Sequence, residues 1–309
     1  MSLSVVYTRA ALGVKAPLIS VEVHLSNGLP GLTLVGLPET TVKEARDRVR
    51  SAIINSGYTF PAKKITINLA PADLPKEGGR YDLPIAIALL TASEQLSAPR
   101  LGHYEFVGEL ALTGALRGVP GAISGAIAAL NAGREIIVAT DNAAEVSLIE
   151  QKGCLVAGHL QEVCAFLEGK HQLAEPEPVP FSTEPESNDI NDIIGQEHGK
   201  RALEITAAGS HNLLLIGPPG TGKTMLASRL NGLLPPLSNH EALESAAIIS
   251  LVNASSLHKQ WRKRPFRAPH HSASLAAMVG GGSIPAPGEF SLAHNGMLFL
   301  DALPEFERR

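Results

Sequence analysis

Gly217-Pro218-Pro219-Gly220-Thr221-Gly222-Lys223-Thr224 decides the fold class of this 309-residue chain. The apolar run Asn212-Leu213-Leu214-Leu215-Ile216 precedes it, and residues 225–230 form a helix-competent run after it. This order predicts a strand, a phosphate-binding loop and a helix. Glycines let backbone N–H groups approach one anion closely, and the helix adds the positive end of its dipole. A Gly/Pro-rich turn that matches by chance would explain neither flank, so the pattern predicts a nucleotide site.

The second half of such a site is an acidic residue at the end of a neighbouring strand, which holds Mg²⁺ through water. Met297-Leu298-Phe299-Leu300-Asp301 fits, because four apolar residues end in a carboxylate. Any buried strand can end in Asp, but the phosphate-binding loop favours the Mg²⁺ interpretation. We therefore expect Lys223 and Asp301 to be catalytic, and Thr224 and Asp301 to hold Mg²⁺. The expected ATP-binding residues are Gly217, Pro218, Pro219, Gly220, Thr221, Gly222, Lys223 and Thr224.

Composition limits the other classes of function. The formal net charge is −4, so contact with a nucleic acid would need a local basic patch. The two cysteines, Cys154 and Cys164, cannot form a disulfide framework and do not have a common metal-ligand spacing. The N-terminus lacks a signal-type segment, and no apolar run reaches transmembrane length. We expect a cytoplasmic protein without a membrane partner.

Residues 1–170 alternate between strand and helix patterns, which predicts a mixed α/β domain. Asn27-Gly28, between two of the strand patterns, predicts a hairpin. The expected strands are 18–25, 32–35, 65–69, 106–112, 135–139 and 155–157, and the expected helices are 41–55, 83–92, 122–131, 143–149 and 163–167.

The chain changes character after this domain. Residues 171–188 alternate Pro and Glu, which cannot build a core and predict a stiff, solvated linker. Residues 189–309 form the second expected domain, with a helix from about residue 200 to residue 208 before the strand that leads into the phosphate-binding loop.

Several stretches together resemble the AAA+ ATPases of the magnesium-chelatase-like group, specifically the ComM/YifB type. The resemblance covers essentially the whole chain. Its most specific parts, besides the phosphate-binding loop, are residues 31–38 (GLTLVGLP), 70–79 (APADLPKEGG), 264–271 (RPFRAPHH) and 296–306 (GMLFLDALPEF).

The resemblance implies a fold and a function. The implied fold is α/β: a Lon-protease-like N-terminal domain, then a P-loop AAA+ domain of three α/β/α layers that is incomplete at its C-terminus. The implied function is an ATP-driven hexameric ring that acts as a DNA branch-migration helicase in recombination during natural transformation. Two alternatives stay open: an ATPase that remodels a protein or assists metal insertion, and a nucleotide-binding assembly module without turnover. The Lon-like first domain favours the DNA motor over chelatase subunits.

Two departures from the family pattern bear on hydrolysis. Family members have Asp-Glu after the acidic strand, whereas this chain has Asp301-Ala302. Alanine cannot orient the attacking water, so we expect ATP binding to survive and hydrolysis to fall by roughly 10²–10⁴-fold. The less favoured alternative is that Glu305, three residues further along the chain, orients the attacking water in place of the missing glutamate. The family's sensor asparagine, arginine finger and lid domain would lie beyond Arg309, the last residue here.

The segment between the loop and the acidic strand is longer than a compact AAA+ core needs, and in this clade such insertions look toward the pore. Its cations Lys259, Arg262, Lys263, Arg264 and Arg267 alternate with Trp261 and Phe266. Cations that contact phosphates and aromatic rings that stack on bases would make this segment the candidate DNA contact. The alternatives are a solvated loop and a subunit contact. His270-His271 does not have the spacing of a metal site.

The Lon-like resemblance does not extend to protease chemistry. A Lon-type site needs a Ser activated by a Lys. The Ser would fall within residues 78–83, which contain none, and the Lys would fall near residues 121–124, where Ser124 stands. We therefore expect a scaffold or DNA-facing collar, for which Arg46, Arg48, Arg50, Lys63, Lys64, Lys76 and Arg80 are candidates.

Overall fold

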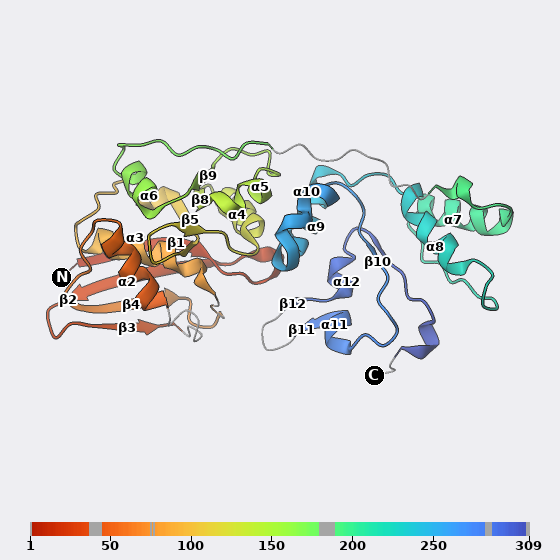
Figure 1. Cartoon of the computed structure of the whole chain (residues 1–309), viewed down its shortest axis with the longest axis horizontal. Helices are drawn as coiled ribbons and strands as arrows, with labels where there is room; N and C mark the ends of the chain where they lie inside the picture. Colours follow the sequence, from red (N-terminus) through yellow and green to blue (C-terminus); the bar gives the residue numbers. More distant parts are fainter. Residues whose placement is uncertain are drawn as a thin grey trace. The chain divides into compact units, whose positions relative to one another are not determined.

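The computed structural model describes residues 2–36, 45–74, 76, 78–178, 189–281 and 286–306. The chain divides into two compact units (Figure 1). The first unit comprises residues 1–179 with 253–255, and the second comprises 180–252 with 256–309. The predicted α/β fold class is confirmed, because a large and mostly parallel sheet is combined with helices.

The first unit is built on a seven-stranded sheet of order β3-β4-β2-β1-β5-β8-β9. β2 pairs antiparallel with β1 and with β4, and the other neighbouring pairs of the sheet are parallel. The strands are β1 (Ser2–Arg9), β2 (Leu18–Ser26), β3 (Gly31–Val35), β4 (Lys64–Ala70), β5 (Tyr104–Val107), β8 (Glu135–Ala139) and β9 (Cys154–Ala157).

The hairpin predicted at Asn27-Gly28 is wrong. β4 lies between β2 and β3, pairing antiparallel with β2 and parallel with β3. The hairpin partner of β2 is β1, with Val6 opposite Val21. β4 has three inward residues, Ile65, Ile67 and Leu69, that are at most 1% exposed. Inside the sheet, the side chains of both neighbouring strands surround these residues on the core face, and this burial outweighs the local turn signal.

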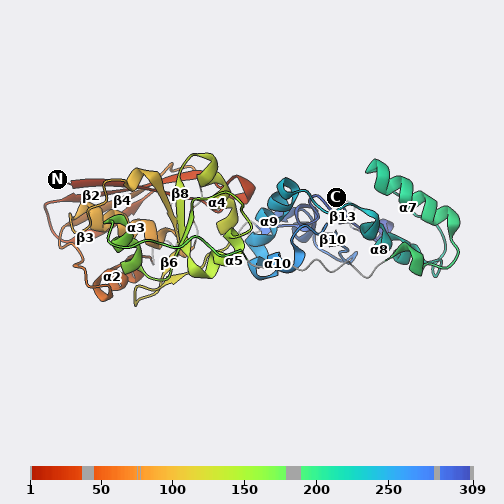
Figure 2. The same cartoon turned by 90° about the horizontal axis from the view of Figure 1, so that it is seen from above.

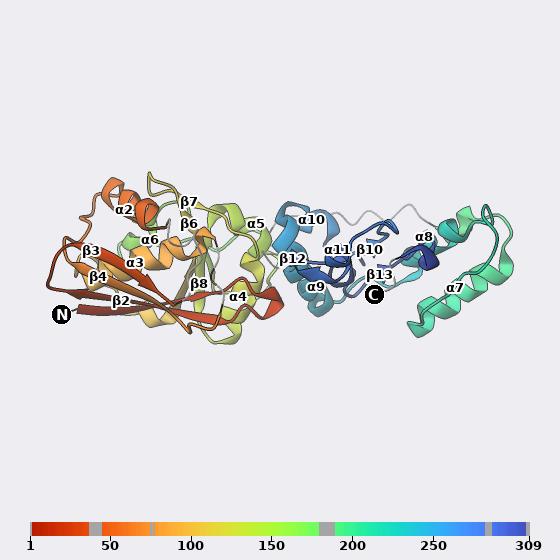
Figure 3. The same cartoon turned by 90° about the horizontal axis from the view of Figure 1, so that it is seen from below.

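Helices cover both faces of the sheet. The helices are α2 (Ala45–Asn55), α3 (Asp82–Ala92), α4 (Ala122–Asn131), α5 (Ala143–Val146) and α6 (Leu160–Leu167). α2 and α3 lie on one side of β2, β3 and β4 (Figure 3). Ile137 and Ala139 of β8 face the core on the α3 side, while Ile136 and Val138 face the α4 side. This alternation is the period of two expected for a strand buried on both faces. Residues 41–44 of the helix expected at 41–55 lie outside the described residues.

Two other segments of the first unit differ from the structure expected from the sequence. The strand expected over 106–112 is interrupted at Gly108, after which β6 (Glu109–Leu110) pairs with β7 (Leu116–Arg117). At the start of the expected linker, Ala174 forms an isolated bridge with Val156 of β9. Residues 179–188 of that linker lie outside the described residues.

The second unit is mainly helical in its described part (Figure 2). Ile193 and Leu203 pack against Leu226 and Leu230 and so join α7 to α8. β10 pairs parallel with β13, and β11 pairs antiparallel with β12. The helices are α7 (Glu197–Gly209), α8 (Lys223–Leu233), α9 (Asn239–Asn253), α10 (Leu257–Gln260), α11 (Leu275–Val279) and α12 (Glu289–Leu292), and the strands are β10 (Phe266–Arg267), β11 (Gly280–Gly281), β12 (Ala286–Pro287) and β13 (Met297–Leu298).

The strand expected over residues 212–216 is not formed. The segment pairs with none of the described strands, and Leu214 and Ile216 are 69% and 87% exposed. A strand needs a neighbour whose backbone groups complete its hydrogen bonds. The described strand pairs of this unit are each two residues long, so none of them extends to this run. None of the described helices combines the length and apolarity needed to cross a lipid bilayer.

Candidate nucleotide-binding site

Hydrogen bonds join the end of the loop at residues 217–224 to its beginning. Gly220 and Gly222 have φ angles of +83° and +81°, a region that glycine enters without strain. Lys223 is the first residue of α8, and its ammonium group donates hydrogen bonds of 2.9 Å to the carbonyl oxygens of Gly217 and Pro218. Thr221 Oγ1 donates to the same Pro218 oxygen at 2.9 Å. The lysine ammonium therefore lies against the first two residues of the loop, while Lys223 itself begins a helix, whose N-terminus favours an anion.

The two predicted Mg²⁺ ligands lie in contact. Thr224 Oγ1 donates to Asp301 Oδ2 at 3.1 Å, although the residues are far apart in sequence. Both side chains are exposed. A hydroxyl and a carboxylate are hard oxygen donors of the kind that Mg²⁺ selects, and Mg²⁺ uses one or two protein ligands together with water and phosphate. The donor set therefore fits magnesium bound to a nucleotide.

The strand expected over residues 297–301 is formed only at Met297–Leu298 (β13), and Asp301 lies in a turn three residues further on. β13 is held by its parallel neighbour β10. Met297 N donates to Pro265 O at 2.7 Å, and Phe299 N donates to Arg267 O at 2.8 Å. A Cβ atom at Gly296 would lie 2.1 Å from Pro265 O, so only glycine allows the two chains to approach this closely. These contacts therefore fix the position of Met297, from which the chain leads to Asp301.

Position 302 offers no carboxylate. Ala302 has a φ of +53°, and its N–H donates to Asp301 Oδ1 at 3.0 Å. Glu305 ends the short helix η7 (Leu303–Glu305), and its Oε2 lies 3.6 Å from His271 Nε2. His270 Nδ1 contacts Ser272 Oγ at 2.8 Å, so the two adjacent histidines have different partners.

The five candidate DNA-binding cations fall into two groups. Arg267 makes a bidentate ion pair with Glu289, with both distances 2.6 Å, which raises the pKa of Arg267 and lowers that of Glu289. Arg264 is also bonded within the unit, to Pro235 O and Asn295 O at 2.7 Å.

The other group consists of Lys259, Arg262 and Lys263. Lys259 and Arg262 are exposed and Lys263 is half-buried, and Arg262 Nε donates to Leu237 O at 3.0 Å. Trp261 is 8% exposed and presents no open ring face.

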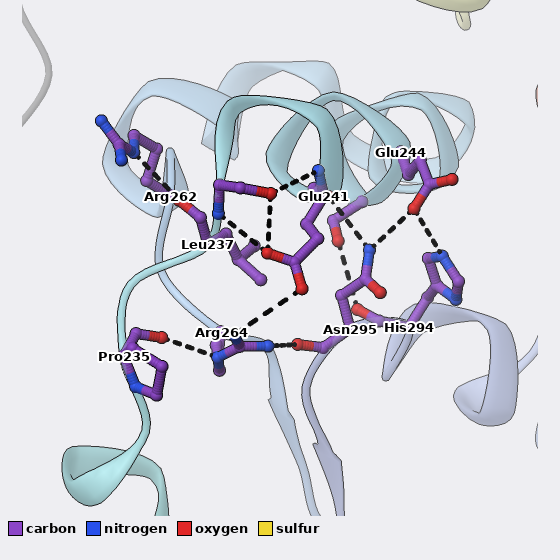
Figure 4. A network of polar contacts seen from close by, with 10 residues as sticks. Pro235, Leu237, Glu241, Glu244, Arg262, Arg264, His294 and Asn295 are labelled. Atoms are coloured by element: carbon purple, nitrogen blue, oxygen red, sulfur yellow. Dashed lines mark hydrogen bonds and ion pairs between the residues drawn. The ribbon is translucent and has the colours of Figure 1, made fainter. Parts of the chain in front are cut away.

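Sequence reasoning missed a polar network beside the site (Figure 4). Glu241 accepts bonds from Ser238 at the start of α9, which together with nearby Arg264 lowers the pKa of Glu241. Glu244 accepts from Asn295 Nδ2 at 3.1 Å and lies 3.4 Å from His294 Nε2, and these contacts lower its pKa. The available signals were the Ser-x-x-Glu spacing of a capping box and the Asn-Gly turn at 295–296.

In the first unit, a buried arginine lies in the segment where a Lon-type serine would fall. Arg80 is 4% exposed; it donates to Arg9 O at 3.3 Å and to Pro120 O beside the start of α4. Burial lowers the pKa of Arg80. Ser124, near the expected lysine position, is 2% exposed. Among the collar candidates, Arg80 and Lys76 are buried and Arg48 is bonded to Asp82, so these three do not present a DNA-facing surface.

Comparison with known proteins relates both units of the chain to magnesium-chelatase-like proteins. The family models "Magnesium chelatase, subunit ChlI" and "Subunit ChlI of Mg-chelatase" match residues 189–309 and 21–142. The uncharacterised protein YifB of Escherichia coli is 78% identical over 309 residues, covering all of this chain and 61% of the relative. The competence protein ComM of Haemophilus influenzae is 60% identical over 315 residues, covering all of this chain and 62% of the relative.

A shorter match concerns a protease. The archaeal Lon protease of Archaeoglobus fulgidus is 46% identical over 46 residues, which is 15% of this chain and 7% of the relative. The chain spans about three fifths of the length of YifB and ComM.

Proposed function

The chain belongs to the magnesium-chelatase-like family of the ComM/YifB type, and from that premise we propose that it is an ATP-binding AAA+ motor that acts on DNA. Mg²⁺ and ATP are the proposed cofactors. Residues 217–224 would bind the phosphates, with Lys223 facing the β- and γ-phosphates, and Thr224 and Asp301 would hold the magnesium ion. The bound ion would neutralise charge on the phosphates.

The observation that supports this proposal best is the contact between Thr224 and Asp301. It joins the first turn of α8 to Asp301, three residues after the end of β13, at 3.1 Å. A turn that matched the loop pattern by chance would have no reason to meet an acidic residue 77 positions further along the chain. The lysine at the N-terminus of α8 supplies the positive charge that such a site needs.

The test is equilibrium binding of a fluorescent ATP analogue with Mg²⁺. We expect Lys223→Ala to weaken binding by about 10–100-fold, because a hydrogen bond to a charged group contributes about 1.5–3 kcal/mol. Lys200→Ala is the matched control: Lys200 is a lysine of α7 outside the loop and should not affect affinity. Wild-type protein without affinity for adenine nucleotides, or Lys223→Ala protein with unchanged affinity, would contradict the proposal.

The DNA part of the proposal rests on the relation to the competence protein ComM. We propose branch migration in recombination during natural transformation, performed by a ring that is a hexamer when ATP is bound. Binding to a four-way DNA junction and to a duplex, measured with ATP over a salt series, tests this directly. Affinity should fall steeply with salt, because phosphate contacts release counterions. Absent binding or a flat salt response would remove the DNA proposal.

A second candidate follows from the family models, which are named after a subunit of magnesium chelatase. This candidate is an ATPase that remodels a protein or assists metal insertion. Nucleotide binding without any DNA binding would favour it. With Ala302 in place of glutamate, we propose that this chain binds ATP and barely hydrolyses it, as a nucleotide-binding assembly module would.

A further inference from the structure

Arg264 lies between the two halves of the candidate nucleotide site. On one side, Asn231 Nδ2 of α8 donates to the Arg264 carbonyl oxygen at 3.1 Å. Asn231 is 7% exposed and lies two turns after Thr224 on the same helix. The main chain of Arg264 is therefore fixed to the helix that begins in the phosphate-binding loop.

The side chain of Arg264 points to the other half of the site (Figure 4). Its Nη1 donates to Asn295 O at 2.7 Å, two residues before the acidic strand begins at Met297. Its Nε donates to Pro235 O at 2.7 Å, and its Nη2 lies 3.7 Å from Glu241 Oε1. The side chain is 17% exposed, and the bonds use the fork geometry that only arginine provides.

The turn that Arg264 holds is fixed from a second direction by α9. Asn295 Nδ2 donates to Glu241 O and to Glu244 Oε2, both at 3.1 Å. Asn295 has a φ of +58°, which asparagine tolerates better than most residues. Ser245 Oγ donates to His294 O at 3.2 Å. The start of the acidic strand thus has several polar anchors, and one of them, Arg264, is also bonded to α8 through Asn231.

These contacts form a closed circuit. It runs from α8 through Asn231 to Arg264, then to Asn295 and along the chain through β13 to Asp301, and back to α8 through Thr224. We propose that Arg264 is a positioning residue that sets Asp301 against Thr224 for magnesium, and that it is not a DNA contact. This inference rests on the proposed nucleotide function of the same site.

The test separates magnesium affinity from nucleotide affinity. A fluorescent ATP analogue is bound to wild-type and Arg264→Gln protein, first in EDTA and then during a Mg²⁺ titration. We expect Arg264→Gln to weaken Mg²⁺ affinity of the nucleotide complex by roughly 10–100-fold, the usual effect of removing a group that orients a metal ligand. Affinity in EDTA should stay within about twofold, because Lys223 and the loop are unchanged.

Two further variants complete the design. Arg201→Gln removes an exposed arginine of α7 that pairs with Glu204, and it should leave the Mg²⁺ titration unchanged. Arg264→Lys keeps the charge beside Glu241 but cannot bond both carbonyls, so its Mg²⁺ affinity should be intermediate. Thermal unfolding shows that each variant is folded, and Arg264→Lys provides the decisive result if Arg264→Gln does not fold.

The outcomes are distinguishable. Mg²⁺ affinity within about twofold of wild type in the folded Arg264 variants would overturn the inference, as would weaker binding to a DNA junction with an unchanged Mg²⁺ titration. Wild-type protein that binds no nucleotide would instead overturn the proposed function.

Discussion

Ala302 stands where the resemblance to the family led us to expect glutamate, and the structure shows the contacts around it. Its N–H is bonded to Asp301, and its methyl group offers no oxygen. The next acidic residue after position 302, Glu305, lies beside His271. The carboxylate side chain that would orient the attacking water is missing at position 302, while the proposed magnesium ligands remain in contact.

Restoring the carboxylate should restore hydrolysis. We expect Ala302→Glu, introduced into a chain of the full length of its relatives, to raise the ATP hydrolysis rate by roughly 10²–10⁴-fold, the usual contribution of a group that takes a proton from the attacking water. Phosphate release under saturating ATP measures this. Ala302→Gln is the matched control, since it adds the same bulk without a base, and it should stay near the rate of the unchanged chain. Equal rates for the two variants would show that position 302 does not act through a carboxylate.

At the scale of elements, the buried pair between α2 and α3 gives the first unit a pH dependence. Arg48 of α2 donates to Asp82 of α3 at 2.8 and 3.2 Å, and Leu110 N donates at 3.2 Å. Burial raises the pKa of Asp82 from 3.8 to about 6, although the bonds from Arg48 and Leu110 act in the opposite direction. The folded state therefore favours the protonated carboxyl group.

The sign of the effect follows from the two pKa values. Because the folded pKa is the higher one, the contribution of Asp82 to stability is fully present below pH 3.8 and is lost as pH rises through about 6. The loss amounts to about 3 kcal/mol at the upper end. Asp82→Asn, which cannot ionise, should gain stability relative to wild type over this range. Hydrogen exchange of α3 amides in both proteins measures the difference, and a difference that stays constant with pH would contradict the prediction.

The sequence predicted elements well where the pattern was local and long. α4 and β8 begin and end at the residues expected from apolar periodicity. The prediction from sequence failed where the structure depends on which strands pair with one another. The Asn27-Gly28 turn does not join two paired strands because β4 lies between them, and residues 212–216 have a strand composition without a neighbour among the described strands. Strand pairing depends on chain segments distant in sequence, and a window of residues contains no information about them.

For the whole molecule, salt dependence distinguishes the two groups of cations. Lys259, Arg262 and Lys263 make no ion pair that would neutralise them in the described structure, whereas Arg267 is paired with Glu289. Replacing Lys259, Arg262 and Lys263 together by glutamine should lower the salt slope of junction binding by about 2–3 per subunit, since each phosphate contact contributes about 0.7–0.9. Arg201→Gln serves as the control with one exposed arginine removed elsewhere. A slope unchanged by the triple substitution would place the DNA contact on other residues.

The sequence predicted the chemistry of the candidate site, because Lys223 and Thr224 have a fixed spacing in the phosphate-binding loop and Asp301 follows an apolar run. The structure added which side chains support them. From its charge and its aromatic neighbours in the sequence, Arg264 was a candidate nucleic-acid contact. Its bonds to Pro235 O and Asn295 O show that its side chain is bonded within the second unit instead. Charge alone does not reveal whether a cation faces solvent or backbone carbonyl groups.

The hydrogen bonds of Lys223 to Gly217 O and Pro218 O have a consequence for ligand choice. The ammonium group is already solvated by its own loop, so an arriving ligand must offer more than the two carbonyl dipoles that it displaces. A triphosphate would place the oxygens of its β- and γ-phosphates against the lysine and so replace both carbonyl contacts. AMP has no β- or γ-phosphate, so it should be a poor competitor at this loop even though it carries the same base and sugar.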